Sequence, residues 1–438
     1  MRGRNGGTNG CWGKCPSRLA LYWRGEEPPM EYEVANRLGT SGYRGEETEF
    51  EEDPGVLWAQ AVRLEDHSMP FFVWAEGRPS EDPLLLYNRV RWRDESELDA
   101  ARSARWMIYV ETLLEREDPV RSYQRQLSVA AALADDLVVA CLDVSSFTLR
   151  SNLSLRELAS SPAPPRPDAL YTIHLVYNGD EEAWLHTHGL ARAGAPELDI
   201  LGVGRGQARV AGEVLQALSA QLLDAGAQVE ETGGVHVFGH DLAVQLVPWR
   251  DAVEELSPGA LGGARDRQDE FHGGFRFVCG EATGNALDGS FVPLAPTLER
   301  MAGNPVVYVT HAETRRMEIL ARERWPLAAM AFFSLEPHDR RLLVKLGYRV
   351  DGGKETDREH LWFEVLTIGK GTVEAKLLNE PYHIGRMKAD EVGGHDLALL
   401  TDFTLSTPQG TFTPETIGEF GELDLFTDPA REQGIARR

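Results

Sequence analysis

Residues 106–142, WMIYVETLLEREDPVRSYQRQLSVAAALADDLVVACL, decide the fold class of the first part of the chain. The five residues that open this stretch are apolar and rich in β-branched and aromatic types, which predicts a strand. Asp118 and Pro119 are the residue types that favour the N-cap and the first position of a helix. The continuous apolar run from Leu137 to Leu142 predicts a buried second strand. A strand, a helix and a strand of these lengths indicate a sheet covered by a helix.

The rest of the chain shows the same mixture of strand-like and helix-like spacing of apolar residues. Alternating and continuous apolar runs predict strands, and apolar residues every four positions between Val210 and Leu222 predict a helix. The expected strands are 171–177, 183–190, 198–203, 361–368 and 372–378, and 235–249 is expected to form one long strand or a pair of strands. The expected helices run from 310 or 311 to 324 and from 336 to 346. The fold class predicted from this order is α+β, with two to three modules of mainly antiparallel sheets packed against helices.

A proline-rich segment marks the clearest boundary. Residues 160–167, SSPAPPRP, favour stiff, extended chain because proline fits neither a helix interior nor a central strand. The expected segments are a disordered leader at 1–18, an N-terminal α+β domain at 19–158, a linker at 159–167, a middle α+β domain at 168–305, a small C-terminal α+β domain at 306–425 and a tail at 426–438.

The net charge of the chain limits the classes of partner that we expect. The 438 residues carry a net charge of −24, which disfavours nucleic acid and anionic membrane surfaces and suits a protein partner with a basic surface. No apolar run approaches the roughly 20 residues that span a bilayer, and residues 1–17 lack the apolar core of a signal peptide. Four cysteines form no disulfide framework in so long a chain. We expect a cytoplasmic protein, and the sequence does not indicate its oligomeric state.

The densest group of chemically active residues lies in WLHTHGL, residues 184–190. On a strand His186 and His188 point to the same face, so both imidazoles can reach one metal ion, and Glu197 follows after a short loop as a candidate carboxylate ligand. A divalent metal is thus one interpretation. The other is that these histidines are structural and hydrogen-bond the backbone at a turn. Nothing in the sequence fixes Glu197 or any other residue as the third ligand, so no cofactor is predicted.

A second candidate site lies near the C-terminus. His360 and Trp362 share one face of a predicted strand, and Asn379 and Glu380 belong to a predicted turn that ends at Tyr382. These five residues are candidates to line a groove. Trp362, Tyr382 and the following His383 could instead belong to the core of the domain, and for these three the core is the preferred interpretation.

Two resemblances accompany these motifs. Residues 359–365, 378–381, 387–392 and 400–403 resemble a bacterial domain of unknown function, family 2314. The HTHGL motif at 186–190 with PEL at 196–198 is similar to unknown-function family 4026, in the N-terminal and middle parts of the chain. It is also similar to suppressor-of-fused-like domains, which in bacteria are associated with immunity against toxins. Neither numbered family implies a catalytic residue or an activity.

The common nucleotide and nucleophile motifs fail in this chain. In GVGRG, residues 202–206, the third glycine of the dinucleotide pattern is replaced by Gln207, and no phosphate-binding loop or nucleophile elbow occurs. The sequence therefore favours a cytoplasmic binding or regulatory protein, and an immunity-like role through protein–protein contacts is the most concrete version of this interpretation. The alternatives are a metal-dependent hydrolase built on His186, His188 and Glu197, and a sensor of a small ligand.

Overall fold

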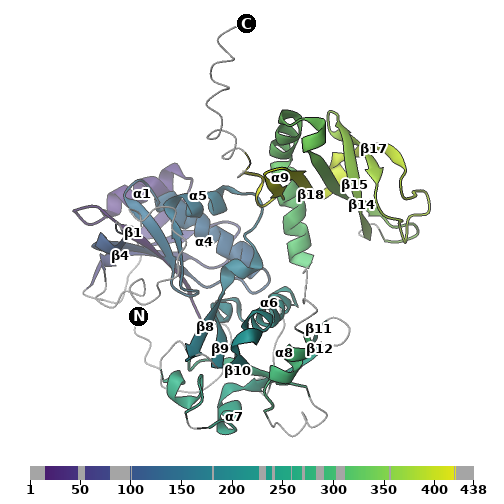
Figure 1. Ribbon diagram of the computed structural model, residues 1–438. Coiled ribbons are helices and arrows are strands. Elements are labelled where there is room, and N and C mark those ends of the chain that lie inside the picture. The colour runs from purple at the N-terminus through teal and green to yellow at the C-terminus, as the bar shows by residue number, and fades with distance from the viewer. Residues whose placement is uncertain are drawn as a thin grey trace. The chain divides into compact units, whose positions relative to one another are not determined.

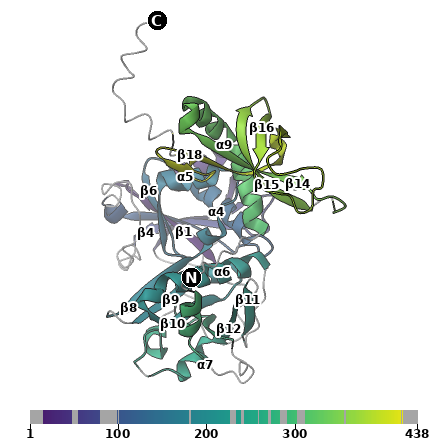
Figure 2. The ribbon, with the colours of Figure 1, turned by 45° about the vertical axis from the view of Figure 1, so that its right-hand side comes forward.

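The computed structural model describes residues 15–47, 55–78, 99, 101–179, 182–225, 233–238, 242–257, 259–268, 272–282, 291–301, 311–354, 357–418 and 420. The chain divides into two compact units, Met1–Thr310 (unit 1) and His311–Arg438 (unit 2). Unit 1 contains two sheets, A and B, and unit 2 contains sheet C (Figures 1 and 2). The strand pairs are antiparallel except for β10 with β13, and helices pack on the sheets, so the predicted α+β class is confirmed.

Sheet A has the strand order β2-β3-β4-β5-β1-β6-β7. Its helices share one core with one sheet face, because Leu38 of α1, Leu127 of α4 and Leu155 of α5 pack with Leu19 and Leu21 of β1. As predicted, Asp118 caps α4, and its carboxylate accepts a hydrogen bond from the Arg121 N–H at 3.0 Å. The elements are β1 (Ser17–Trp23), α1 (Glu31–Thr40), β2 (Arg44–Glu47), β3 (Val56–Arg63), β4 (Phe71–Gly77), β5 (Trp106–Thr112), α4 (Pro119–Leu133), β6 (Val138–Asp143), β7 (Thr148–Ser151) and α5 (Asn152–Ser160).

Sheet B has the order β11-β12-β13-β10-β9-β8. The elements are β8 (Thr172–Asn178), β9 (Glu182–His188), β10 (Glu197–Gly204), α6 (Ala208–Ala225), β11 (Gly234–Phe238), β12 (Leu242–Pro248), α7 (Trp249–Glu254), β13 (Arg276–Glu281) and α8 (Ala295–Met301). Leu185 packs with α6 on one face, whereas Trp184 packs with Ala252 of α7 on the other. Because side chains alternate along a strand, His186 and His188 share the face of Trp184.

The predicted linker is held against helix α4. The Gln124 side-chain amide donates hydrogen bonds to the Ser161 and Ala163 carbonyls at 2.9 and 3.1 Å, and Ala163 is buried. One continuous apolar core runs through both sheets of unit 1. The proline-rich segment therefore connects two sheets that are packed together.

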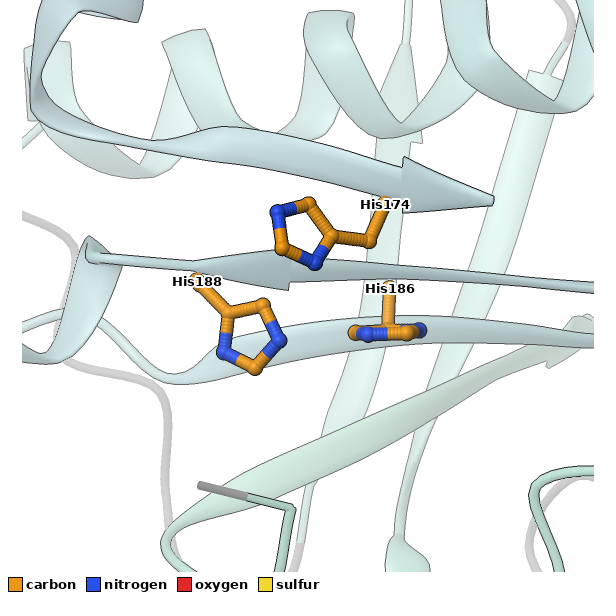
Figure 3. Close-up of side chains that lie close together, drawn as sticks. All are labelled: His174, His186 and His188. Carbon is orange, nitrogen blue, oxygen red and sulfur yellow. The ribbon is translucent and has the colours of Figure 1, made fainter. Parts of the chain in front are cut away.

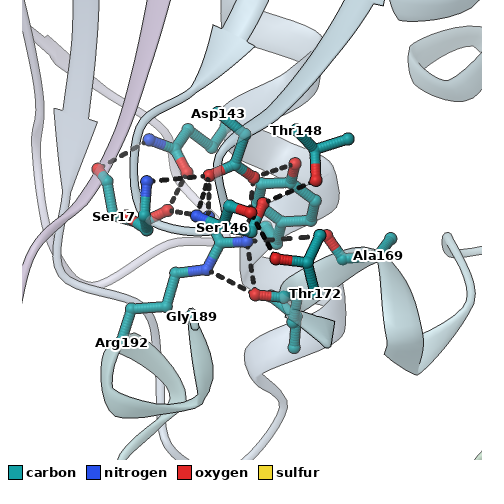
Figure 4. Close-up of polar contacts among 12 residues, drawn as sticks. Ser17, Asp143, Ser146, Thr148, Ala169, Thr172, Gly189 and Arg192 are labelled. Atoms are coloured by element: carbon teal, nitrogen blue, oxygen red, sulfur yellow. Dashed lines mark hydrogen bonds and ion pairs between the residues drawn. The ribbon is translucent and has the colours of Figure 1, made fainter. Parts of the chain in front are cut away.

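A buried ion pair joins the two sheets (Figure 4). Arg192, in the turn after β9, donates to both carboxylate oxygens of Asp143 at the end of β6, at 3.0 and 2.8 Å, and neither side chain is exposed. The Tyr123 hydroxyl donates to Asp143 at 2.6 Å, and the Arg192 guanidinium lies 4.5 Å from the centre of the Tyr123 ring. Arg192 also donates to the Leu170 carbonyl at 2.7 Å and to Ser17 Oγ at 3.0 Å. Each charge is thus paired and hydrogen-bonded, as burial requires.

Sheet C of unit 2 has the order β17-β16-β15-β14-β18-β19. The predicted hairpin at 361–368 and 372–378 agrees with β15 and β16. The elements are α9 (His311–Ser334), β14 (Arg341–Arg349), β15 (Arg358–Ile368), β16 (Thr372–Leu377), β17 (Val392–Asp396), β18 (Leu400–Thr407) and β19 (Gly410–Phe412). Across the ranges described in both units, no helix is both long and apolar enough to cross a membrane.

The helix predictions for 310–346 need correction. The first helix does not end at Arg324 but continues through Pro326 to Ser334, because Ala328, Ala331 and Phe332 are buried against the sheet. The helix predicted at 336–346 is wrong. A short turn at Pro337–Asp339 leads instead into strand β14, where Leu342, Val344 and Leu346 are buried at alternate positions. Period-two burial between two partner strands outweighs the helix-start signal of Glu336 and Pro337.

We expect Arg192→Met to lower the free energy of unfolding by about 3–5 kcal/mol, because it leaves the Asp143 carboxylate buried without its cation. Urea unfolding of the full chain measures the change. Arg209→Met is the matched control, since Arg209 pairs with Glu213 on the surface of α6, and a loss below about 0.5 kcal/mol is expected there. Equal losses in the two variants would contradict the role assigned to Arg192.

Candidate metal centre

The hairpin of β8 and β9 brings a third histidine to His186 and His188. His174 lies directly opposite His186 in the register of the two strands, and Thr172 lies opposite His188. Opposite residues of an antiparallel pair point to the same face, so the three imidazoles gather on one side of sheet B (Figure 3). One nitrogen from each ring lies within 4.8 Å of the others. We call these three residues the histidine triad.

Two members of the triad, His186 and His188, are buried and neutral. His186 is 1% exposed and His188 is 4% exposed. Burial lowers the pKa of both side chains far below the ordinary value of histidine, and the neighbouring Arg276 guanidinium lowers each pKa further. His186 Nδ1 and His188 Nε2 are buried without a hydrogen-bond partner among the described residues. A buried polar atom without a partner is unfavourable unless something else satisfies it.

Aromatic rings and a fourth histidine surround the triad. The His272 ring centre lies 5.0 Å from that of His186 and 5.1 Å from that of His188. Trp184 packs on His186 at 4.1 Å, and Phe147 meets His188 edge-on at 5.1 Å. Phe147 has a φ of 54°, a backbone conformation that is rare for a bulky residue and that is often found at functional sites.

A buried charge cluster adjoins the triad on the same sheet face. Asp199 lies opposite His186 on the neighbouring strand β10, and its carboxylate accepts hydrogen bonds from Trp184 Nε1 at 2.7 Å, Arg267 at 3.1 Å and Arg276 at 3.3 Å. Arg276 also donates to the Thr187 carbonyl at 3.1 Å. The side chains of Asp199 and of both arginines have no exposure. Two guanidiniums and one carboxylate leave one positive charge beside the neutral histidines.

Glu197 does not belong to the triad. Its carboxylate accepts hydrogen bonds from Thr187 Oγ1 at 2.7 Å and from the Gly189 and Ala191 N–H groups at 2.7 and 3.1 Å. It is absent from the group whose ligand atoms lie within 4.8 Å of one another. The carboxylate therefore stabilises the turn that follows His188, and the structure brings His174 to the place that the sequence had suggested for Glu197.

The C-terminal candidate residues serve several roles. Asn379 Oδ1 accepts a hydrogen bond from the Trp362 N–H at 3.2 Å, and a Glu380 carboxylate oxygen accepts one from the Ala389 N–H at 2.9 Å. Both side chains thus stabilise local turns. Tyr382 is 89% exposed, so placing it in the core was wrong.

His360 and Trp362 have separate surroundings although they share a strand face. His360 Nδ1 is hydrogen-bonded to Thr401 Oγ1 at 3.1 Å and lines a cleft of unit 2. Trp362 lies under the Lys345 ammonium, 5.5 Å from the centre of its ring. Neither Trp362 nor the turn residues Asn379, Glu380 and Tyr382 line that cleft.

Comparison with known families concerns unit 1. Residues 46–165 match the family described as protein of unknown function (DUF4026) N-terminal, and residues 173–278 match protein of unknown function (DUF4026) C-terminal. This part of the chain belongs to the DUF4026 family. The first match covers most of sheet A, and the second contains the triad together with His272. No curated protein and no solved structure matches the chain. The resemblance of unit 2 to family 2314 stays a prediction.

His174 and His272 were missed from the sequence for different reasons. Asn178 and Gly179 are turn-forming residues, and a register that pairs Asn178 with Glu182 also pairs His174 with His186. That register was a usable signal. His272 comes from the loop before β13, and no local pattern predicts that this loop reaches the triad.

The metal-free protein is expected to lose stability in acid. The unfolded chain binds a proton at each histidine near pH 6.5, whereas His186 and His188 stay neutral when folded, so stability falls as the pH drops below about 6.5, by about 1.4 kcal/mol per pH unit for each residue. Urea unfolding of chelator-treated protein at two pH values, about 7.5 and 5.5, measures this loss. His188→Gln should remove about half of the histidine contribution, and His338→Gln, on the surface of unit 2, should remove none. An unchanged loss in His188→Gln would count against the buried neutral histidine.

Proposed function

We propose that unit 1 holds a divalent transition metal, zinc in the first place, through His174, His186 and His188. The observation that supports this most directly is the gathering of three imidazole nitrogens within 4.8 Å on one sheet face. Neutral imidazole is the form that binds metal, and burial keeps His186 and His188 neutral. A bound ion would also satisfy the buried ring nitrogens that lack a hydrogen-bond partner.

The spacing suits zinc after a small adjustment. Zn–N distances of 2.0–2.1 Å in a tetrahedral site put ligand nitrogens about 3.3 Å apart. The three ring nitrogens now lie within 4.8 Å of one another, so they need to move closer by about an ångström or somewhat more to bind zinc. Side-chain rotation can supply this movement. His174 is less buried than the other two and pairs with β9 on one side only, at the edge of sheet B, so it has the most freedom to move.

The chemistry that follows is hydrolysis. Zinc held by three histidines with one open position lowers the pKa of a bound water to about 7 and makes it a nucleophile. Arg267 and Arg276 carry two positive charges against the single negative charge of Asp199. The remaining positive charge favours a substrate whose negative charge grows during the reaction. Phosphate and carboxylate esters both meet this requirement. The proposed activity is metal-dependent ester hydrolysis.

Purified, tag-free protein should contain about one equivalent of zinc or a related metal, measured by elemental analysis. His174→Ala, His186→Ala and His188→Ala are each expected to lower this content at least tenfold, because a two-histidine remnant binds weakly. Glu197→Gln should keep the metal, since an amide oxygen can still accept the hydrogen bonds of the turn. His338→Ala is the surface control. Metal lost with Glu197 but kept without His174 would contradict this ligand set in favour of the one suggested by the sequence.

His272 decides between an open and a closed centre. If the three-histidine site is open, His272→Ala keeps the metal and slows ester hydrolysis about 10²-fold or more through lost proton transfer. The assay uses bis-p-nitrophenyl phosphate and p-nitrophenyl acetate, with activity removed by chelator and restored by zinc. Loss of metal in His272→Ala would instead make His272 a fourth ligand, and a closed four-histidine site is structural. That result would contradict the hydrolase.

A second candidate is a binding or regulatory role. The net charge of −24 favours a partner with a basic surface and would speed its capture. An immunity-like role is the most concrete version of this candidate, and a metal-free protein would support it over the hydrolase.

The buried thiols of Cys141 and Cys279 suit the reducing cytoplasm. Burial raises the pKa of Cys141 to about 12, which makes its thiol unreactive.

A further inference from the structure

A cleft in unit 2 carries an independent set of charges. It has a volume of about 910 Å³ and lies between the first turns of α9, the starts of β15 and β18, and β14. Its size is within the range of small-molecule sites, roughly 300–1,000 Å³. Uncharged residues, among them Gly347 and Leu399, make up part of its lining. Nothing in this cleft depends on the metal centre of unit 1.

The charges that line the cleft are mainly guanidiniums. Glu318 is paired with Arg322 at 2.6 Å, and Arg322 also donates to two backbone carbonyls. Arg315 pairs with no described residue. Arg358 has one long hydrogen bond, 3.4 Å to the Gly347 carbonyl. With Asp357 as the remaining carboxylate, the described residues of the lining carry a net charge of +1, in a chain of net charge −24.

The register of sheet C adds a second observation. Arg358 lies directly opposite Arg349 on β14. Like charges at opposite positions of an antiparallel pair destabilise the sheet. An anion beside Arg358 would offset that repulsion.

The floor of the cleft offers a hydrogen-bond acceptor. Thr401 Oγ1 donates to the Lys345 carbonyl at 3.1 Å, so its oxygen accepts the Nδ1–H of His360. Burial lowers the pKa of His360, which keeps the ring neutral and leaves Nε2 as an acceptor. A Cβ on Gly347 would lie 3.2 Å from the His360 ring, so glycine keeps the space beside the ring open.

We propose that this cleft binds a small organic oxyanion that carries a hydroxyl group. Arg315 and Arg358 hold the carboxylate or phosphate, and His360 Nε2 accepts a hydrogen bond from the hydroxyl. Guanidinium forks match both oxyanions, so the shared chemistry includes hydroxycarboxylates and sugar-phosphate-like molecules.

Isothermal titration of the full chain with glycerol 3-phosphate, glycerate and inorganic phosphate tests the proposal. We expect one of the two hydroxylated probes to bind more tightly than inorganic phosphate, and their ranking identifies the anion. Arg315→Gln/Arg358→Gln should weaken that probe at least tenfold, and His360→Phe should remove its advantage over inorganic phosphate.

Arg341→Gln/Arg386→Gln is the matched control, because it removes the same charge from two exposed arginines of unit 2 that pair with Glu364 and Asp351 outside the cleft. Its affinity should equal that of the unaltered protein. Equal weakening by both double variants would overturn the proposal, and so would the absence of saturable binding of all three probes up to about 10 mM.

Discussion

Arg192 and Asp143 place two full charges where neither has any exposure, and the position of the histidine triad depends on how these charges are satisfied. The bidentate contact, the Tyr123 hydroxyl and the Leu170 carbonyl fix the turn that ends β9 against sheet A. Glycine is required at the first residue of this turn: Gly189 has a φ of 113°, and a Cβ there would lie 2.3 Å from the Leu170 carbonyl oxygen. His188 directly precedes this constrained turn, so the ion pair that joins the two sheets also holds one of the three imidazoles.

Burying the polar side chains of His186 and His188 on one face of β9 costs free energy, and a purely structural role does not explain why that cost is met. A strand packed on both faces is ordinarily apolar throughout, yet His186 and His188 are buried opposite the face that packs on α6. The His186 ring packs on Trp184 and Phe147 meets the His188 ring edge-on, but His186 Nδ1 and His188 Nε2 have no hydrogen-bond partner among the described residues. A bound cation would use the nitrogen lone pairs that hydrophobic packing leaves unsatisfied. Phe147, which lies between β6 and β7 of sheet A, contacts the rings of His174 and His188, so both sheets contribute to the surroundings of the triad.

The α+β class, the capped helix α4 and the strands β5, β6, β8, β9 and β10 follow from local patterns, because cap chemistry and apolar runs act over a few residues. The strands β1 to β4, β7 and β13 were not predicted. The strand β14 did not, because Leu342 to Leu346 satisfy helical and strand spacing alike until the partner strands are known. Two of the three histidines of the triad could be predicted from the sequence. His186 and His188 share a face by strand geometry alone, whereas His174 required the hairpin register. His272 and the Asp199 cluster required the tertiary structure. Glu197 was suggested by its nearness in sequence, and the structure shows its carboxylate hydrogen-bonded to the turn that follows His188.

The two candidate sites suit ligands of opposite charge, so their electrostatic requirements are opposite. In unit 1 the histidines must remain neutral and buried to bind a cation, and adjacent Arg276 helps by disfavouring their protonation. In unit 2 an anion must approach a chain of net charge −24, so long-range attraction works against it and short-range contacts must provide the affinity. Guanidiniums suit that task because they stay charged and bind oxyanions through paired hydrogen bonds. Screening by salt weakens the long-range repulsion more than contacts inside a cleft, so the overall acidity of the chain does not exclude an anionic ligand there.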